Sequence, residues 1–236
     1  FGKTLGMSML ASFFDIRKDS KESFQDLEIS TCTDLCRTWQ NQYPTIFISF
    51  RRVDGLTFSE ASYMLSTVIS ELYQEHSYLL DSPAFNAYDK NTFSKIASGI
   101  TNPLELKDSL FFLTRMMQKH YGKPVILLID EYDVPIAKAN THGYYQEMLN
   151  LMKGIMQALK DNPAVITGCL KIAKESIFTG TNNFVSDTIA DSRFNEYFGF
   201  TQKEVDQILE DAEITELAPV IKSWYDGYHF GNFDVY

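Results

Sequence analysis

The sequence predicts an α/β domain built around a parallel sheet, and three observations support this fold class. Short β-rich runs alternate along the chain with longer amphipathic helical segments. The run from Val125 to Ile129 is apolar at every position, as expected for a parallel strand covered on both faces. The chain has 236 residues, 44% of them hydrophobic, which is enough for the core of one such domain with a modest appendage.

The first third of the chain predicts one helix and one strand. Residues 3 to about 14 carry apolar side chains at helical spacing and predict a helix. The polar stretch 15–22 is expected to run over the surface. The β-rich run 45–50 follows a proline and predicts a strand, and Asp54-Gly55 marks a turn after it.

The middle of the chain predicts two long helices separated by a loop. Thr57-x-x-Glu60 has the pattern of a capping box and precedes an amphipathic helix. Residues 78–101 show weak periodicity and predict a loop with about one helical turn. Asn102-Pro103 opens a second helix, which is expected to end near His120, before Gly122.

The last part predicts one more core helix and strand, followed by an appendage. An apolar stripe predicts a helix over 143–160, and the run 164–169 predicts a further buried strand. Thr201-x-x-Glu204 predicts a capping box opening a helix to about 211, and 219–225 predicts another. Residues 1–196 are therefore expected to form the core. Residues 197–236 are expected to begin a small helical or winged-helix appendage.

Charge and hydropathy narrow the class of protein. The formal net charge of −10 argues against a surface that binds nucleic acid over its whole area, and no dense Lys/Arg run appears. No apolar run is long enough to span a bilayer, and nothing at the start resembles a signal peptide. We therefore expect a cytoplasmic protein without a membrane partner.

The cysteines do not predict a metal site. Cys32 and Cys36 are four residues apart, but no second Cys or His pair follows at a suitable distance, and Cys169 stands alone. Reduced, partly buried thiols are the expected state.

The tripeptide Gly2-Lys3-Thr4 has the pattern of the end of a phosphate-binding loop that runs into a helix. In such a loop Lys3 would place a cation against the β- and γ-phosphates, and the Thr4 hydroxyl would bind Mg²⁺. Backbone N–H groups at the helix start would add to the anion site. Taken alone the tripeptide is common by chance, and the first glycine of Gly-x-x-x-x-Gly-Lys-Thr would precede residue 1.

Two acids at the end of the predicted central strand strengthen that interpretation. Asp130 and Glu131 directly follow the apolar run, at the strand end where open parallel sheets bind ligands. Asp130 could hold Mg²⁺ through a water, as in a Walker B motif, and Glu131 could deprotonate the attacking water. Alternatively both acids cap the strand and meet solvent. Asp133 could support the site by contacting the residues that bind the ligand, or it could be a surface acid. The two motifs together favour a nucleotide site.

Further positions have two interpretations each. Thr167, at the end of the next strand, could sense the γ-phosphate or hydrogen-bond its own turn. Arg193 could stabilise developing phosphate charge, in cis or from a neighbouring subunit, or form a surface ion pair. Lys171 and Lys174 with Glu175 could line the nucleotide cleft or a polynucleotide path, and i, i+4 pairing on a helix surface explains Lys171 and Glu175 equally well.

Several segments together resemble one family, and the resemblance runs nearly end to end. The segments are Phe1–Leu5, Leu128–Pro135, Thr167–Asn183, Tyr197–Thr201 and Trp224–Tyr228. The chain resembles the bacterial AAA-ATPase-like family, whose members usually carry a PD-(D/E)XK nuclease-like domain after this region. The resemblance implies a P-loop ATPase sheet of the additional-strand type, in which the strand before Lys3 lies beside the Thr167 strand. It also implies a basic stretch upstream, where a glycine would normally begin the loop.

The leading hypothesis is an ATP-binding module that hydrolyses or senses ATP with Mg²⁺ and regulates a downstream effector domain. Nucleic acid, through that downstream domain, and a second copy of the chain are the expected macromolecular partners. A catalytically degenerate scaffold that binds a protein partner is the alternative. A nuclease fits only a longer protein, because no Asp…Glu-x-Lys arrangement appears on strands in this sequence.

The start of the sequence carries a further expectation. The strand before Gly2 should be central in the sheet, and without it neighbouring backbone groups would lack partners. We expect this chain to fold poorly alone, and a chain that begins about 30 residues earlier, to include strand and loop, to be more soluble.

Overall fold

The computed structural model describes residues 2–99, 102–169, 184–188, 191, 193–194, 197, 199–225, 227–230 and 233–235. The chain divides into two compact units. The larger is Thr4–Asn182, and the smaller combines Phe1–Lys3 with Asn183–Tyr236. No helix among the described residues is long and apolar enough to cross a membrane.

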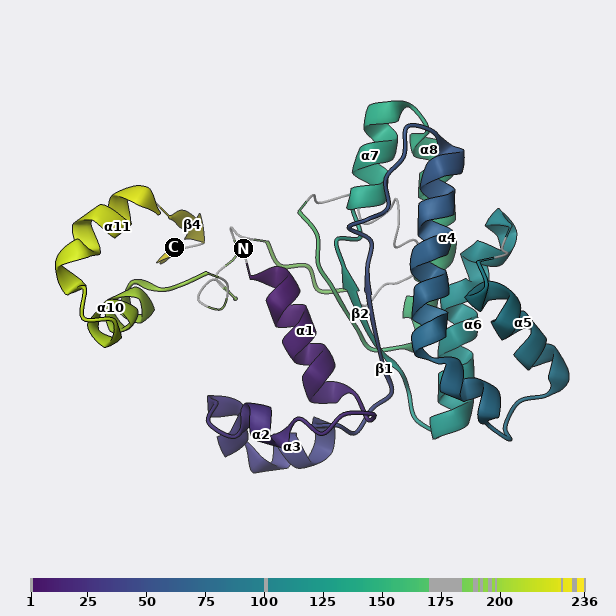
Figure 1. Ribbon diagram of the computed structural model, residues 1–236, viewed down its shortest axis with the longest axis horizontal. Coiled ribbons are helices and arrows are strands. Elements are labelled where there is room, and N and C mark those ends of the chain that lie inside the picture. The colour runs from purple at the N-terminus through teal and green to yellow at the C-terminus, as the bar shows by residue number, and fades with distance from the viewer. Residues whose placement is uncertain are drawn as a thin grey trace. The chain divides into compact units, whose positions relative to one another are not determined.

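The larger unit is built around a parallel sheet of three strands, which confirms the predicted α/β class. The strands are β1 (Thr45–Ser49), β2 (Ile126–Asp130) and β3 (Ala164–Ile166), in the order β1-β2-β3 (Figure 1). Ser49 lies opposite Asp130 across the first pair, and Ile129 lies opposite Ile166 across the second. All five residues of β2 are buried, as the apolar run predicts for a central strand.

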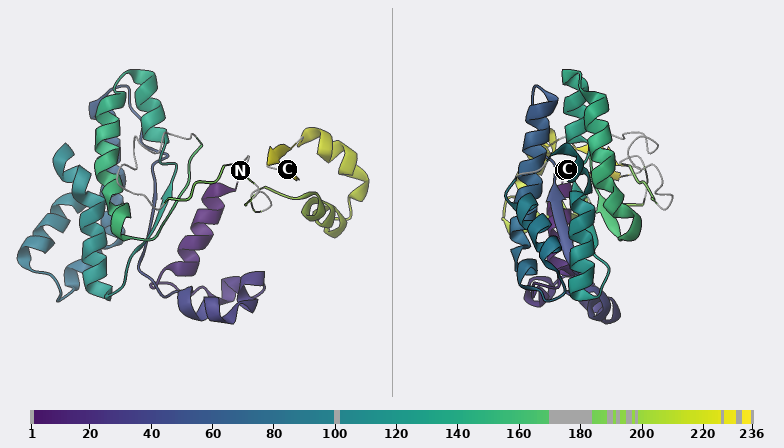
Figure 2. Two further views of the ribbon diagram at one scale, coloured as in Figure 1. Left: turned by 180° about the vertical axis from the view of Figure 1, so that it is seen from behind. Right: turned by 90° about the vertical axis from the view of Figure 1, so that its right-hand side faces the viewer.

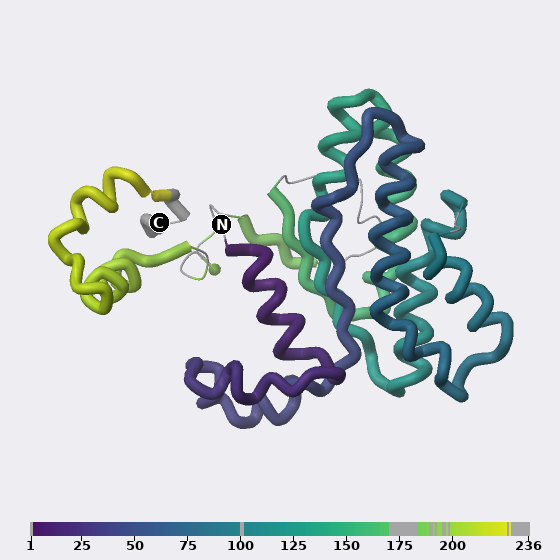
Figure 3. Tube along the Cα trace, in the orientation of Figure 1, coloured from purple at the N-terminus to yellow at the C-terminus, as the bar shows by residue number. Residues whose placement is uncertain are grey.

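Helices cover both faces of this sheet. Helix α1 (Lys3–Phe14) lies on one side, and α4 (Phe58–Glu75), α6 (Pro103–Tyr121) and α8 (Tyr145–Ile155) lie on the other (Figures 1 and 2). Met7 and Ala11 of α1 pack against Ile126 and Leu128, the alternate residues of β2 that point to that side. Figure 3 follows the chain from β1 into α4 and back through α5 (Ala87–Ala97) and α6 to β2.

The boundaries of α6 confirm the sequence signals that predict it. The Asn102 side chain accepts hydrogen bonds from the backbone N–H groups of Leu104 and Glu105, each at 2.9 Å. The Glu105 carboxylate accepts from the Asn102 N–H at 3.3 Å, which completes a capping box. Gly122 ends the helix with a φ of 64°, a left-handed conformation that suits glycine. This stop leads the chain directly into β2.

The capping signal before α4 is only half realised. Thr57 accepts from the Glu60 N–H at 3.3 Å, as predicted. The Glu60 carboxylate, however, accepts from the N–H of Leu56 at 2.8 Å, so the return bond goes one residue further back than a capping box requires.

The predicted loop over 78–101 is wrong. This segment contains the 3₁₀-helix η2 (Ser77–Asp81) and the helix α5 (Ala87–Ala97), which begins at a full capping box of Asn86 and Asp89. Only Phe93 and Ile96 of α5 are buried, so its apolar stripe is too narrow to give a clear helical period.

Two other segments differ from expectation. The polar stretch 15–22 is not wholly on the surface, because Asp15 and Ser20 are buried and hydrogen-bonded to Arg17 and Asn41 respectively. The expected helix over 143–160 is α8 followed by the 3₁₀-helix η3 (Met156–Asp161). The other helical elements among the described residues of this unit are α2 (Lys21–Phe24), η1 (Glu28–Thr31), α3 (Thr33–Trp39) and α7 (Val134–His142).

The strand β3 is shorter and less buried than predicted. It covers three residues, and Val165 at its centre is 39% exposed. Within the described part of the chain β3 pairs with β2 alone, so it forms one edge of the sheet. An edge strand has a neighbour on one side only, which explains the exposure.

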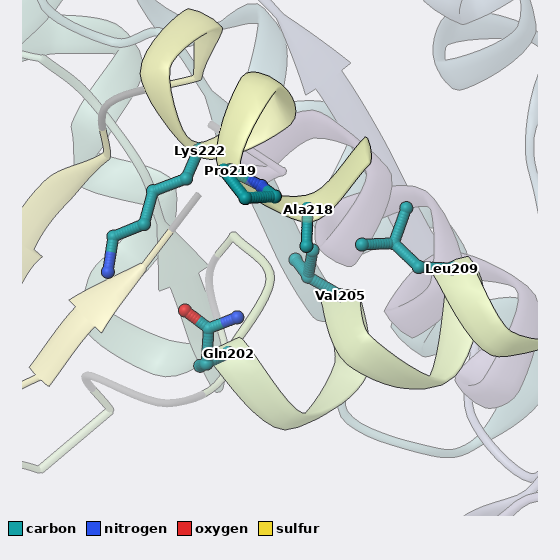
Figure 4. A pocket seen from close by; sticks show the side chains of 6 residues that line it. All are labelled: Gln202, Val205, Leu209, Ala218, Pro219 and Lys222. Carbon is teal, nitrogen blue, oxygen red and sulfur yellow. The ribbon is translucent and has the colours of Figure 1, made fainter. Parts of the chain in front are cut away.

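The described residues of the smaller unit form two α-helices and a hairpin. These are α10 (Gln202–Asp211), α11 (Ala218–Trp224) with the 3₁₀ turn η4 (Thr215–Leu217) before it, and the antiparallel strands β4 (Tyr228–Phe230) and β5 (Phe233–Val235). The predicted capping box of Thr201 and Glu204 is confirmed. A shallow pocket of about 370 Å³ lies between α10 and α11 (Figure 4), lined by Gln202, Val205, Leu209, Ala218, Pro219 and Lys222. The winged-helix assignment and the boundary at 196/197 stay predictions.

Candidate functional site

The centre of the candidate site is the buried carboxylate of Asp130 at the end of β2, which is 1% exposed. Its Oδ2 accepts a hydrogen bond from the Thr4 hydroxyl at 2.7 Å, and its Oδ1 accepts from the Thr167 hydroxyl. Three segments far apart in the sequence therefore meet at one carboxylate: the first turn of α1, the end of β2 and the residue after β3.

The parallel register explains this convergence. Thr167 extends β3 by one residue, because its N–H donates to the carbonyl of Ile129 at 2.9 Å. The carbonyl of Thr167 then accepts from the N–H of Tyr132 at 3.3 Å, which ties the segment after β3 to the loop after β2. Thr4 reaches the same edge because α1 packs along β2 through Met7 and Ala11. The site thus lies at the carboxyl ends of the strands, where open parallel sheets bind ligands.

Glu131 has an unusual backbone conformation. Its φ is 53°, in the left-handed region, which costs a non-glycine residue about 1–2 kcal/mol. The side chain is half-buried, and within the described residues it has no hydrogen-bond partner. Such strained residues cluster at functional sites, where the surrounding structure holds them in place. Glu131 therefore places a second carboxylate directly after Asp130 in the sequence, in a backbone conformation that lowers the stability of the fold.

Asp133 is buried, so its interpretation as a surface acid is wrong. It is 2% exposed, and its Oδ2 accepts a hydrogen bond from the N–H of Cys169 at 3.0 Å. Gly168 packs directly against it, since a Cβ on that glycine would lie 2.6 Å from Asp133 Oδ1. Sequence reasoning missed the role of Gly168. A glycine directly after Thr167, at a strand end, was the available signal.

The remaining candidates belong to the smaller unit. Gly2 has a φ of 77°, and Lys3 is the first residue of α1. Arg193 is exposed and forms an ion pair with Asp187 at 3.5 Å, and its guanidinium lies 5.0 Å from the centre of the Phe194 ring. Candidates Lys171, Lys174 and Glu175 lie outside the described residues, as do Phe1 and the rest of the segment 170–183.

The donor set suits a hard divalent cation. Thr4 and Asp130 offer a hydroxyl and a carboxylate, the oxygen ligands that Mg²⁺ takes with few protein groups and several waters. The part of the chain that the structure describes holds no group of three or more His, Cys, Asp or Glu side chains that could enclose a metal. Cys32 and Cys169 are exposed, and the Cys36 thiol contacts the carbonyl of Ile29 at 3.2 Å.

Comparison with known proteins decides the family. The sequence profile described as predicted AAA-ATPase matches residues 1–178. The chain belongs to the predicted AAA-ATPase family. A relative in Azotobacter chroococcum mcd 1, described as an uncharacterized protein in the vnfD 5′ region, is 26% identical over 243 residues. The alignment covers all of this chain and 41% of the relative, so this predicted AAA-ATPase chain spans about two fifths of that protein's length. No solved structure matches the chain.

Proposed function

We propose that this predicted AAA-ATPase chain binds ATP with Mg²⁺ and hydrolyses it at the carboxyl edge of the sheet. The observation that carries the proposal is the meeting of Thr4, Thr167 and the buried carboxylate of Asp130. Burying a carboxylate is unfavourable unless hydrogen bonds or a cation offset the lost hydration. The hydroxyls of Thr4 and Thr167 satisfy it here, and the three side chains form a cluster of oxygen ligands.

The proposed roles follow from the chemistry of each side chain. Gly2 and the N–H groups at the start of α1 form part of the phosphate site, where the positive end of a twelve-residue helix favours anions. Lys3 adds a cation against the β- and γ-phosphates. Thr4 and Asp130 hold Mg²⁺, which neutralises phosphate charge when bound.

Three further side chains serve the reaction itself in this proposal. Glu131 accepts a proton from the attacking water, for which its carboxylate is free of hydrogen bonds among the described residues. The Thr167 hydroxyl, which contacts Asp130, turns to donate to the γ-phosphate. Arg193 stabilises the charge that develops on the transferred phosphoryl group, either in its own chain or in a neighbouring copy.

A second candidate function is a scaffold that has the nucleotide fold but catalyses nothing. One observation favours it: the hydroxyls of Thr4 and Thr167 already engage both oxygens of Asp130, so the carboxylate is satisfied without a cation. In either case we propose that residues 1–196 act as the core, that 197–236 begin an appendage, and that the module regulates an effector domain of the nuclease-like class. A nucleic-acid partner of that domain and self-association of the chain rest on the same resemblance.

The test is Mg²⁺-ATP binding and turnover by the full-length protein beside Glu131→Gln. We expect the wild type to hydrolyse ATP and the variant to bind it without hydrolysis. Glu213→Gln is a matched control, because Glu213 is an exposed glutamate with a similar φ of 57° in the smaller unit. It should keep wild-type turnover. Failure of the wild type to bind nucleotide at millimolar ATP would favour the scaffold.

A further inference from the structure

The loop after β2 and the segment after β3 are joined beyond the contact between Thr167 and Asp130. The N–H of Cys169 donates to the Asp133 carboxylate at 3.0 Å, three residues along the loop from Asp130. The N–H of Tyr132 donates to the Thr167 carbonyl at 3.3 Å. The residue that carries a candidate hydroxyl is therefore tied to the β2 loop through its own carbonyl and through Cys169, two residues further along the chain.

Asp133 does not use its side chain in the way its position suggests. It is the N-cap residue of α7, where aspartate normally accepts a hydrogen bond from its own helix and stabilises it by about 1 kcal/mol. The Asp133 side chain makes no such bond. It reaches across to the Cys169 N–H instead, from a buried position. Local helix stability therefore does not explain this carboxylate, whereas the contact with the neighbouring segment does.

Gly168 allows this contact. A Cβ at this position would lie 2.6 Å from Asp133 Oδ1, 3.0 Å from Asp133 Cγ and 2.7 Å from Tyr132 Cε1. These distances are far below van der Waals contact. The absence of a side chain at residue 168 thus lets the backbone approach the carboxylate closely enough for the next N–H to donate to it.

We propose that Asp133 is a positioning residue that clamps the backbone after β3 and thereby holds the Thr167 hydroxyl against Asp130. The role of Thr167 toward nucleotide rests on the proposed function above, but the clamp itself does not. Because Asp133 also begins α7, a displacement of Thr167 by phosphate is transmitted to that helix. A charge-assisted hydrogen bond from a backbone N–H to a buried carboxylate has the strength that such coupling requires.

The test compares Asp133→Ala with Asp133→Asn in the full-length protein, using hydrogen exchange of the Cys169 amide and the kinetics of MgATP turnover. For Asp133→Ala we expect exchange to rise and kcat to fall roughly 10- to 100-fold, the range for one hydrogen bond to a charged group, with little change in KM. Asp133→Asn keeps an acceptor oxygen, so it should retain most of the protection of the Cys169 amide and most of the wild-type kcat. Asp26→Ala removes an exposed carboxylate and should alter neither.

Gly168→Ala tests the same contact from the other side. Its added Cβ should displace the Asp133 carboxylate and reproduce the faster Cys169 exchange, so the proposal can still be tested if Asp133→Ala fails to fold. Unchanged Cys169 exchange in the folded variants would overturn the clamp. Faster exchange with unchanged kcat would overturn the positioning role. A wild type without turnover would contradict the proposed function alone, since the exchange measurement would still decide whether the clamp exists.

Discussion

The buried histidine His76 should make the protein sensitive to mild acid. It caps the C-terminal end of α4, is 1% exposed, and its Nδ1 lies 2.9 Å from the carbonyl of Leu72. The pKa of His76 is lowered from 6.5 to about 4, chiefly by burial and in part by the nearby Arg17, against the opposing effects of the Leu72 backbone, Asp15 and the Thr45 backbone. The imidazole is therefore neutral in the native protein at pH 5.

The direction of the effect follows from the lowered pKa. Between pH 6.5 and 4 the unfolded chain binds a proton at His76 that the native protein does not, so the free energy of unfolding falls as the pH falls through this window. The contribution of neutral His76 to the free energy of unfolding is fully present above pH 6.5. For a shift of this size the loss between pH 7.5 and pH 5.0 is about 2 kcal/mol, approaching about 3.4 kcal/mol below the native pKa.

Urea unfolding of wild type and His76→Gln at pH 7.5 and 5.0 measures this contribution. The two proteins differ only at residue 76, so the difference between their losses isolates His76. We expect the wild type to lose about 2 kcal/mol more than the variant on acidification. His142→Gln, which removes an exposed histidine, should behave like the wild type. Equal losses in wild type and His76→Gln would refute the reasoning.

Three further outcomes are expected. Glu131→Gly should abolish ATP turnover in an ATPase assay, yet raise the free energy of unfolding by about 0.5–1 kcal/mol in chemical denaturation, because glycine relieves the left-handed strain. The control Glu213→Gly should stabilise the smaller unit for the same reason without affecting turnover. Thr4→Val should weaken Mg²⁺-dependent nucleotide binding roughly tenfold in calorimetry while Thr4→Ser retains it, since only Ser keeps a hydroxyl for Asp130. Asn102→Ala should lower the free energy of unfolding by about 1 kcal/mol, because α6 loses its cap.

The central strand and its two acids could be predicted because their signals are local. An uninterrupted apolar run identifies β2, and Asp130 follows it directly. The boundaries of α6 are also local, since Asn102 and Gly122 each satisfy backbone groups within one turn of themselves. Elements defined by neighbouring residues in the sequence are the ones that pattern reasoning identified correctly.

The helix α5 and the burial of Asp15 could not be predicted in the same way. Only Phe93 and Ile96 of α5 are buried, so its sequence lacks the periodic stripe that identifies a helix. Asp15 looks like a surface residue in a polar stretch, but its carboxylate pairs with Arg17 and its backbone forms a bridge with Tyr43, just before β1. The apolar period misses α5, although the capping box of Asn86 and Asp89 that opens it is a local signal, whereas the burial of Asp15 depends on tertiary contacts that sequence periodicity does not record.

The contact between Asp133 and Cys169 shows the same limit within the candidate site. The two residues are 36 positions apart. Their contact depends on the register of β2 with β3 and on the absence of a side chain at Gly168, which lets Asp133 approach the backbone. Neither quantity can be read from one sequence. The sequence shows that an aspartate and a glycine stand at these positions, but it does not show that Asp133 accepts a hydrogen bond from Cys169.

The loop from Asp130 to Asp133 combines three features that the fold alone does not require. A carboxylate is buried at Asp130, Glu131 is held in a left-handed conformation, and Asp133 leaves its own helix uncapped. A strand end that served only the fold would be more stable with glycine or asparagine at position 131 and with a side chain at 133 that caps α7. Of the three, only the left-handed Glu131 has no compensating hydrogen bond in the part of the chain that the structure describes, so Glu131 is the residue whose substitution best separates the proposed ATPase from the scaffold.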